Sequence, residues 1–420
     1  MRPIRLMTLE PGHFHAALVQ KQMVPGIHPR VHVYSVLNDD LLTHLARIVG
    51  FNSRADSPTN WELDVRAGAN AVARCFREQP GNTVVIAGRN KPKIDLILGA
   101  VANGLHVVAD KPWIIDFDDF AKLEQVFYEA DLRELIVRDV MTERFEITNI
   151  LQRELMRDGE IFGTQLVGSV AQPGLLLESV HYLKKHVAGV PLQRPAWWFD
   201  VTQAGEAIAD VGTHLADLAM GLLFPEQPID YKRHIELLNA TTSPTILTPQ
   251  QFHDLTAIHT PNEVHYHGNG TITYKLRGVH VRISNRWEQE AQTGSGDSHE
   301  SIARGSLSQV VIRPVQTTPE LFVIPNDPAK HKTILAKVTH RCQSWQGRWQ
   351  GIRVRDLGDQ IQLEIPAALR VGHEQHFAEV LTEFVTYFHT PRQIPVWERP
   401  NLLAKYYLTT KAVELAKQKQ

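Results

Sequence analysis

The segment Thr83–Pro112, TVVIAGRNKPKIDLILGAVANGLHVVADKP, decides the fold class. Its first five residues form an almost wholly apolar run, which is typical of a strand that a parallel sheet buries on both faces. Ile94–Ala102 then predicts a helix, and Leu105–Ala109 predicts a second strand. This order predicts a βαβ unit that places Asp110-Lys111-Pro112 at the carboxyl end of its second strand.

The same alternation continues on both sides of this unit. Further strands are expected at Ile4–Leu9, Val31–Leu37 and Glu134–Val137, and helices at His13–Gln22, from Leu41 to a stop at Gly50, at Gly68–Arg77 and at Asp116–Ala130. Residues 50–60 show neither period and are expected to be irregular. We therefore expect residues 1–139 to form a Rossmann-like, doubly wound parallel sheet, whose ligands lie beyond the carboxyl ends of its strands.

The pattern changes after residue 139. Helical periodicity recurs at Phe145–Arg157, Ala207–Leu223, His373–His389 and Leu402–Lys417, and the β-rich runs VHYH, TITYKL, VHVRIS, SQVVIRP and IQLEI lie between about residues 230 and 365. These features predict that residues 140–420 form an α+β domain with a largely antiparallel open sheet. Because such a sheet leaves a face and two edges to cover, we expect a homodimer or a homotetramer.

The composition excludes several classes of partner. With 44 Lys+Arg against 46 Asp+Glu, the chain has no excess positive charge for a nucleic acid backbone. No segment approaches the roughly 18 consecutive apolar residues of a membrane span, and MRPIRLMTLE lacks the apolar run of a secretory signal. Cys75 and Cys342 lie far apart in the sequence, as is typical of reduced thiols. We expect a cytoplasmic protein of two domains that binds neither nucleic acid nor membranes.

The turn after the first predicted strand is Glu10-Pro11-Gly12-His13-Phe14-His15. A turn that binds a dinucleotide normally has three glycines. Here only Gly12 is present, and Glu10 places a carboxylate near the expected pyrophosphate. The same residues also suit an ordinary turn with a left-handed Gly12.

Asn38-Asp39-Asp40 lies at the end of the second predicted strand, where a dinucleotide-binding domain has its ribose-binding acid. These carboxylates would repel a 2′-phosphate, which favours NAD over NADP. The alternative is that Asp40 caps the following helix.

Two pairs of histidines suggest a metal site. His13 and His15 are two residues apart, and so are His265 and His267. In a strand such a pair shares one face and can hold a metal ion. Neither pair has a third ligand of clear spacing nearby, so we predict no metal site and expect His13 to lie near the cofactor.

Asn90 and Gly104–Pro112 (GLHVVADKP) are followed roughly a hundred residues later by Gly205–Asp217 (GEAIADVGTHLAD), with Arg144-Phe145 and Gly159–Gly163 between them. These segments resemble the Glu-Lys-Pro region and the Asp-x-Gly-x-His helix of the Gfo/Idh/MocA family of sugar dehydrogenases, with Asp110 as the acid of the first motif. The closing HFAEV…VWERPNLLAKYYLTT is similar to a subgroup with an enlarged carboxyl-terminal oxidoreductase domain.

The resemblance implies an oxidoreductase that uses NAD, with NADP as the alternative, on a ring hydroxyl of a sugar, glycoside or cyclitol. It implies that residues 1–139 bind the nicotinamide dinucleotide and that residues 140–420 bind the carbohydrate. The expected cofactor contacts are Gly12, His13, Phe14, Asn38, Asp39, Asn90, Lys111 and Pro112.

Alcohol oxidation gives the expected catalytic residues their roles, because a base must remove the hydroxyl proton while hydride leaves the same carbon. His214 is the candidate base, and Asp210, four residues earlier, is expected to orient the imidazole or to bind a neighbouring hydroxyl. Lys111 would supply positive charge to the developing alkoxide. Lys184 and Trp198 precede this helix and are expected, with Asp210 and His214, to bind the sugar, or alternatively to form an interface.

Two alternative functions remain open. A redox-neutral enzyme on the same scaffold would use tightly held NAD to oxidise a carbinol transiently, eliminate a glycosidic bond and return the hydride, which makes it a glycosidase or lyase. A non-redox, sugar-binding scaffold protein would have lost the cofactor together with two of the three glycines.

Overall fold

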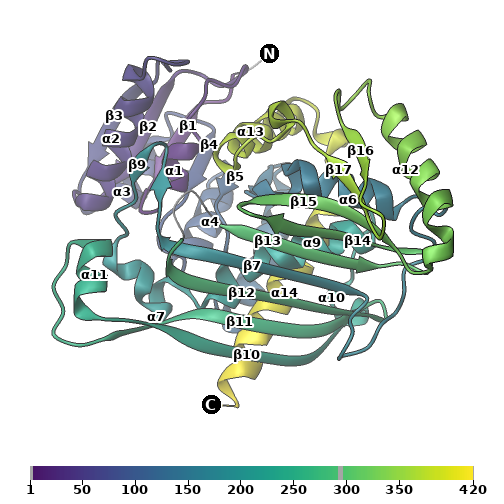
Figure 1. Cartoon of the computed structure of the whole chain (residues 1–420). Coiled ribbons are helices and arrows are strands. Elements are labelled where there is room, and N and C mark those ends of the chain that lie inside the picture. The colour runs from purple at the N-terminus through teal and green to yellow at the C-terminus, as the bar shows by residue number, and fades with distance from the viewer. Residues whose placement is uncertain (1–2, 292–296, 420) are drawn as a thin grey trace.

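A computed structural model describes residues 3–291 and 297–419, which form two large sheets (Figure 1). The first sheet has six strands, all parallel, in the order β3-β2-β1-β4-β5-β6. These strands are β1 (Leu6–Leu9), β2 (Arg30–Ser35), β3 (Glu62–Ala67), β4 (Thr83–Ile86), β5 (His106–Ala109) and β6 (Val137–Asp139). The expected Rossmann-like sheet is confirmed, with the apolar TVVI run as one of its two central strands.

The helices of this part differ from the sequence prediction in length. They are α1 (His15–Leu18), α2 (Asp39–Ser53), α3 (Ala71–Glu78), α4 (Lys93–Ala102) and α5 (Phe120–Leu132). Helix α1 begins late because the N–H groups of Gly12 and His13 both donate to the carbonyl of Ala87, at 3.1 and 2.9 Å. Helix α2 continues past Gly50 because Phe51 is buried in the core. Strand β3 was not predicted.

The second sheet has nine strands in the order β10-β11-β12-β7-β13-β14-β15-β17-β16. They are β7 (Leu175–Lys184), β10 (Ile235–Leu247), β11 (Val264–Leu276), β12 (Val279–Glu290), β13 (Ser298–Arg304), β14 (Ser308–Val315), β15 (Thr318–Pro325), β16 (Arg353–Asp356) and β17 (Ile361–Glu364). Among the described residues, only the β7–β12 pair of this sheet is parallel. The prediction of a largely antiparallel sheet is therefore confirmed. A separate two-stranded sheet joins β8 (His186–Val187) to β9 (Val190–Pro191).

Helices pack their apolar side chains against the second sheet in one core. Those in the core are α6 (Ile147–Met156), α8 (Ala207–Asp210), α9 (Gly212–Leu223), α12 (His331–Ser344) and α14 (Glu398–Lys417). The single helix expected over Ala207–Leu223 is divided at Val211 into α8 and α9. The remaining helices are α7 (Val201–Ala204), α10 (Tyr231–His234), α11 (Pro249–Thr256) and α13 (His373–His389).

Helix α14 packs against both sheets. Figure 1 shows it crossing behind the strands of the nine-stranded sheet. Leu402 and Tyr406 pack into the core of the first sheet, whereas Ala404 and Leu408 pack into that of the second. Between these layers, the fully buried ammonium of Lys405 lies 2.7 Å from Asp139, the last residue of β6. The carboxyl ends of the first sheet are thereby held beside α9.

The polar network around Lys405 extends into α9. Asp217 lies 3.4 Å from the Lys405 ammonium and accepts two hydrogen bonds of 2.6 Å from Arg144. Asp217 therefore has a basic partner on each side.

The expected domain boundary at residue 139 falls on the end of β6 and stays a prediction. Within residues 3–291 and 297–419, no helix combines the length and the apolar character that crossing a bilayer requires.

Candidate active site

Two adjoining cavities lie at the carboxyl ends of the parallel strands. The larger has a volume of about 920 Å³ and is lined by Lys111, Asp210 and His214. The smaller, of about 660 Å³, is lined by Gly12, Asn38 and Asp39. The two cavities share four lining residues, which are His13, Phe14, Arg194 and Trp198. The structure therefore brings the three predicted catalytic residues together, next to most of the predicted cofactor residues.

Lys111 and Asp210 form an ion pair that closes one side of the larger cavity. The side chains are 7% and 13% exposed, so the pair is largely removed from water. Burial opposes the charge of Lys111, but the carboxylates of Asp210 and Asp110 outweigh it and raise the pKa of the ammonium. Asp210 thus holds Lys111 rather than orienting His214, which corrects one role expected of it.

His214 is a buried, neutral base. It stands at the start of α9, beyond the break that separates this helix from Asp210 in α8. Burial and then the charge of Lys111 lower the pKa of the imidazole to about 3. The Nδ1 atom has no hydrogen-bond partner among the described residues. The imidazole is therefore uncharged near neutral pH, and its Nδ1 atom stays free for a ligand.

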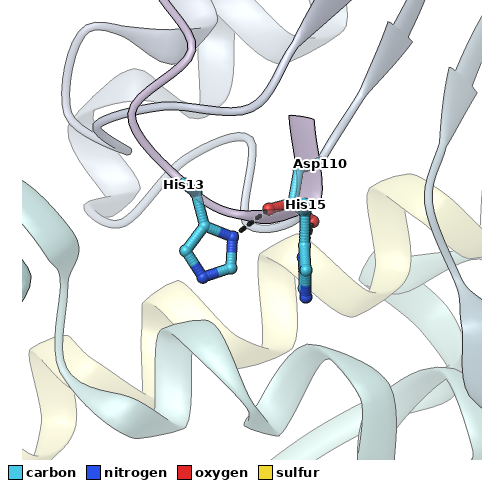
Figure 2. A group of neighbouring side chains, drawn as sticks. All are labelled: His13, His15 and Asp110. Atoms are coloured by element: carbon cyan, nitrogen blue, oxygen red, sulfur yellow. Dashed lines mark hydrogen bonds and ion pairs between the residues drawn. The ribbon is translucent and has the colours of Figure 1, made fainter. Parts of the chain in front are cut away.

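A second cluster stands beside Lys111 and is shown in Figure 2. The Nδ1 atoms of His13 and His15 lie 3.0 and 2.9 Å from separate oxygens of the Asp110 carboxylate. Burial lowers the pKa of both imidazoles. The sequence shows no third polar group close to these histidines. The structure supplies one in Asp110, which is 97 residues from His13 and 95 residues from His15 along the chain.

The larger cavity also holds carboxyl groups that the sequence analysis missed. Oε1 of Glu143 lies 3.5 Å from Nδ1 of His373, the first residue of α13. Glu146, at the start of α6, lines the same cavity, and burial together with the Glu143 charge raises its pKa to about 7. No motif marks these residues, because they meet only where α13 returns to the segment after β6.

The smaller cavity begins at the turn after β1. Glu10, and not Gly12, takes the left-handed conformation there, with φ of 46°. The Glu10 carboxylate accepts hydrogen bonds from the Val36 N–H and the Ser35 hydroxyl, at 3.3 and 3.4 Å. It therefore lies at the end of β2 and not at the expected pyrophosphate position, which corrects that expectation.

Gly12 is packed closely, so that a side chain there would make the Asp40 carboxylate shift. A Cβ atom there would lie 3.2 Å from Oδ2 of Asp40 and 3.4 Å from Cζ2 of Trp197. The alternative of a helix cap at Asp40 is wrong, because the cap is Asn38, whose side chain accepts a hydrogen bond from the Leu41 N–H at 3.0 Å.

Two basic residues of α2 complete the smaller cavity. Among the described residues, both ring nitrogens of His44 and the Nε and Nη1 atoms of Arg47 are buried without a hydrogen-bond partner. Both side chains line the cavity together with Gly12 and Phe14. Unpartnered nitrogens beside this turn suit an anionic ligand.

The other predicted contacts occupy different environments. The Asn90 side chain donates to the Ala204 carbonyl and accepts from the Lys93 ammonium, both at 2.6 Å. It lines neither cavity, so its expected cofactor contact is replaced by a structural role. Pro112 is buried and follows a cis peptide bond.

The two expected sugar-binding residues before α9 also differ from each other. Lys184 is exposed at the cavity wall and pairs with Glu290 at 3.1 Å. Trp198 is buried, and the Arg194 guanidinium lies over its ring at 4.4 Å. Trp198 is therefore a fixed wall between the cavities.

This fold and this site define the class as a two-sheet oxidoreductase of the Gfo/Idh/MocA type. Residues 151–417 match the domain described as "Putative oxidoreductase C terminal domain", and the chain belongs to that family of oxidoreductases. No curated protein matches the chain.

Solved structures are similar over the whole chain. An oxidoreductase from Parabacteroides merdae ATCC 43184 is 39% identical, with 100% of this chain and 98% of that chain covered and a TM-score of 0.95. An Agrobacterium radiobacter oxidoreductase in complex with NAD+, L-tartaric acid and magnesium is 10% identical (99% and 97% covered, TM-score 0.61). KijD10, a 3-ketoreductase from Actinomadura kijaniata in complex with TDP-benzene and NADP, is 15% identical (99% and 98% covered, TM-score 0.59). The last two show the shared fold.

Proposed function

We propose that this oxidoreductase transfers hydride to or from the carbon of a ring hydroxyl in a sugar, glycoside or cyclitol, with NAD as the cofactor. The observation that carries the proposal is the buried Lys111–Asp210 pair beside the neutral imidazole of His214 on one cavity wall. A fixed positive charge beside a neutral base is the combination that alcohol oxidation requires.

The residues around the smaller cavity suit a dinucleotide. The unpartnered nitrogens of Arg47 and His44 lie beside Gly12 and Phe14, where they would hold the pyrophosphate. Asp39 lines the same cavity, and its charge disfavours the extra phosphate of NADP. Because the two cavities adjoin at His13 and Phe14, one dinucleotide could reach from α2 to Lys111. The structures that bind NAD+ and NADP in the same fold support this assignment.

The chain's own residues then account for the proton and the charge. His214 accepts the hydroxyl proton of the substrate, since its imidazole is neutral and lines the same cavity as Lys111. The Lys111 ammonium, held by Asp210, stabilises the negative charge that develops on that oxygen. A nicotinamide ring, when bound, supplies the hydride acceptor.

Polar and aromatic groups support a carbohydrate as the substrate. Lys184, His181 and Trp287 also line the larger cavity, and the imidazole of His181 stacks on the buried Trp287 indole at 4.9 Å. The hydrogen-bonding groups of His181 and Lys184 suit the hydroxyls of a pyranose ring.

Calorimetric titration followed by turnover tests the proposal. NAD+ should bind more tightly than NADP+, and a panel of pyranosides with excess NAD+ should include one that produces reduced nicotinamide. Failure of the folded protein to bind either nucleotide would refute the proposal and favour the sugar-binding scaffold.

A redox-neutral glycosidase or lyase is the second candidate, and Glu146 favours it. Elimination of a glycosidic bond needs an acid that protonates the leaving group. A carboxyl whose pKa is about 7, in the same cavity as His214, suits that role. Following free aglycone and reduced nicotinamide together separates the two candidates, because release of aglycone without accumulated NADH would identify the redox-neutral enzyme.

A further inference from the structure

We propose that His13, His15 and Asp110 bind one divalent transition-metal ion at the edge of the larger cavity. The ligand atoms of these three residues all lie within 4.8 Å of one another. The inference goes beyond the proposed function and does not rest on it, because metal binding is measured without substrate or nucleotide.

The fold carries the three residues to one point across an intervening strand. In the sheet order, β4 lies between β1 and β5. The turn after β1 is anchored on the end of β4 by two hydrogen bonds to Ala87, so it crosses that strand toward Asp110. Gly88 permits the crossing, because a Cβ atom there would lie 2.3 Å from the Glu10 carbonyl oxygen. The backbone at this edge of the sheet therefore holds the three residues of the cluster close together.

The donor set selects the class of ion. Two imidazole nitrogens and one carboxylate oxygen suit Zn²⁺, Fe²⁺, Co²⁺ or Mn²⁺, whereas Ca²⁺ and Mg²⁺ prefer sets of oxygens. Three protein ligands with further positions left open are typical of catalytic metal sites. Here the open side faces the cavity that also holds Lys111 and His214.

The distance of each histidine from the Asp110 carboxylate suits two ligands of one ion. Ligand atoms about 2.1 Å from a common ion lie roughly 3.0–3.4 Å apart in octahedral or tetrahedral sites. The Nδ1 atoms of His13 and His15 are 3.0 and 2.9 Å from the Asp110 oxygens. Each neutral ring would move one proton from Nδ1 to Nε2, which Figure 2 shows on the side of the ring away from Asp110. The ring keeps its proton, and the metal replaces the hydrogen bond to the carboxylate.

Of the two ammonium groups nearby, one is neutralised. Lys111 forms an ion pair with Asp210. Lys93 donates to the neutral Asn90 side chain at 2.6 Å and keeps its charge, which the Asp110 carboxylate faces. An ion in this position would bind an oxygen of a molecule in the cavity and increase the acidity of its hydroxyl proton.

Titration of the full-length, untagged protein after treatment with a chelator tests the proposal. Zn²⁺ alone, followed by calorimetry, should bind once per chain, and Co²⁺ alone should give a ligand-field absorption band in the visible range. His13→Gln and His15→Gln should each weaken the binding of Zn²⁺ by at least about tenfold and remove the Co²⁺ band.

His32→Gln is the matched control. Its imidazole lies 3.0 Å from the Asp64 carboxylate, in the same kind of pair but without the second histidine. This variant should bind both ions like the original protein. Circular dichroism verifies folding, and His13→Gln, at the less buried of the two histidines, decides the matter if His15→Gln does not fold. Absence of stoichiometric binding, retention of binding in His13→Gln, or an equal loss in His32→Gln would overturn the proposal and leave a hydrogen-bond network.

Discussion

Asp210→Asn should destabilise the protein more than its partial exposure suggests. The Lys111 and Asp210 side chains are only 7% and 13% exposed. Removing one member of a buried pair typically costs about 3–5 kcal/mol, because the other charge is left uncompensated. Asp110 also attracts the Lys111 ammonium, so the loss should fall near the lower end, at about 3 kcal/mol.

Equilibrium unfolding in urea at pH 7, followed by circular dichroism, measures this loss. The double variant Lys111→Met with Asp210→Asn should recover most of the stability, since it removes the stranded charge. The control is Glu290→Gln, which breaks the Lys184–Glu290 pair, where both side chains are 58% exposed. That variant should lose no more than about 1 kcal/mol. Equal losses in Asp210→Asn and Glu290→Gln, or no recovery in the double variant, would refute the assignment of a buried pair.

Three further predictions concern catalysis, pH and assembly. His214→Gln should lower turnover on the order of 10²–10⁴-fold. The control is His376→Gln, at a buried histidine outside the two cavities, which should keep its turnover. Equal turnover in the two variants would exclude His214 as the base. The pKa of Glu146 is about 7 against 4.5 when free, so the folded state keeps a proton that the unfolded state loses, and stability falls as the pH rises through this range. Glu146→Gln should therefore flatten the stability profile measured by urea unfolding and stabilise the protein at pH 8 by up to about 3 kcal/mol, and an unchanged profile would contradict this environment. Sedimentation at micromolar concentration should show a homodimer or homotetramer, and a monomer would contradict the expectation drawn from the open sheet.

Strand β4 could be predicted because its burial is visible in its own composition. The run at Thr83–Ile86 is buried throughout, and a parallel sheet leaves no polar alternation there. Strand β3, with the sequence ELDVRA, is an edge strand with mixed exposure, so its charged residues resemble a loop. Strand β10 contains Pro244 and two register shifts, which obscure its period. Local patterns also missed β7 and β13, which lie inside the nine-stranded sheet, so a central position alone does not make a strand predictable.

The catalytic part of the site was predictable because short motifs contain its residues. Lys111, Asp210 and His214 lie in two short segments with recognisable spacing, and they do line one cavity. The partnership of Asp210 with Lys111 was not predictable, because the break at Val211 changes the relation between α8 and α9. The contact of Asp110 with His13 and the position of Arg47 in the smaller cavity could not be predicted. Both depend on contacts between residues that are far apart in the sequence.

Transfer of deuterium tests the central claim most directly. The protein is incubated with NAD+ and the tightest-binding pyranoside, deuterated at every ring carbon, and the reaction is quenched in cold alkali, in which reduced nicotinamide is stable. Mass spectrometry of all free and bound nucleotide should find one deuterium on the nicotinamide, at a level that falls by about two orders of magnitude in His214→Gln. Nucleotide without deuterium, while the folded protein binds both molecules, would contradict hydride transfer as the function of this site.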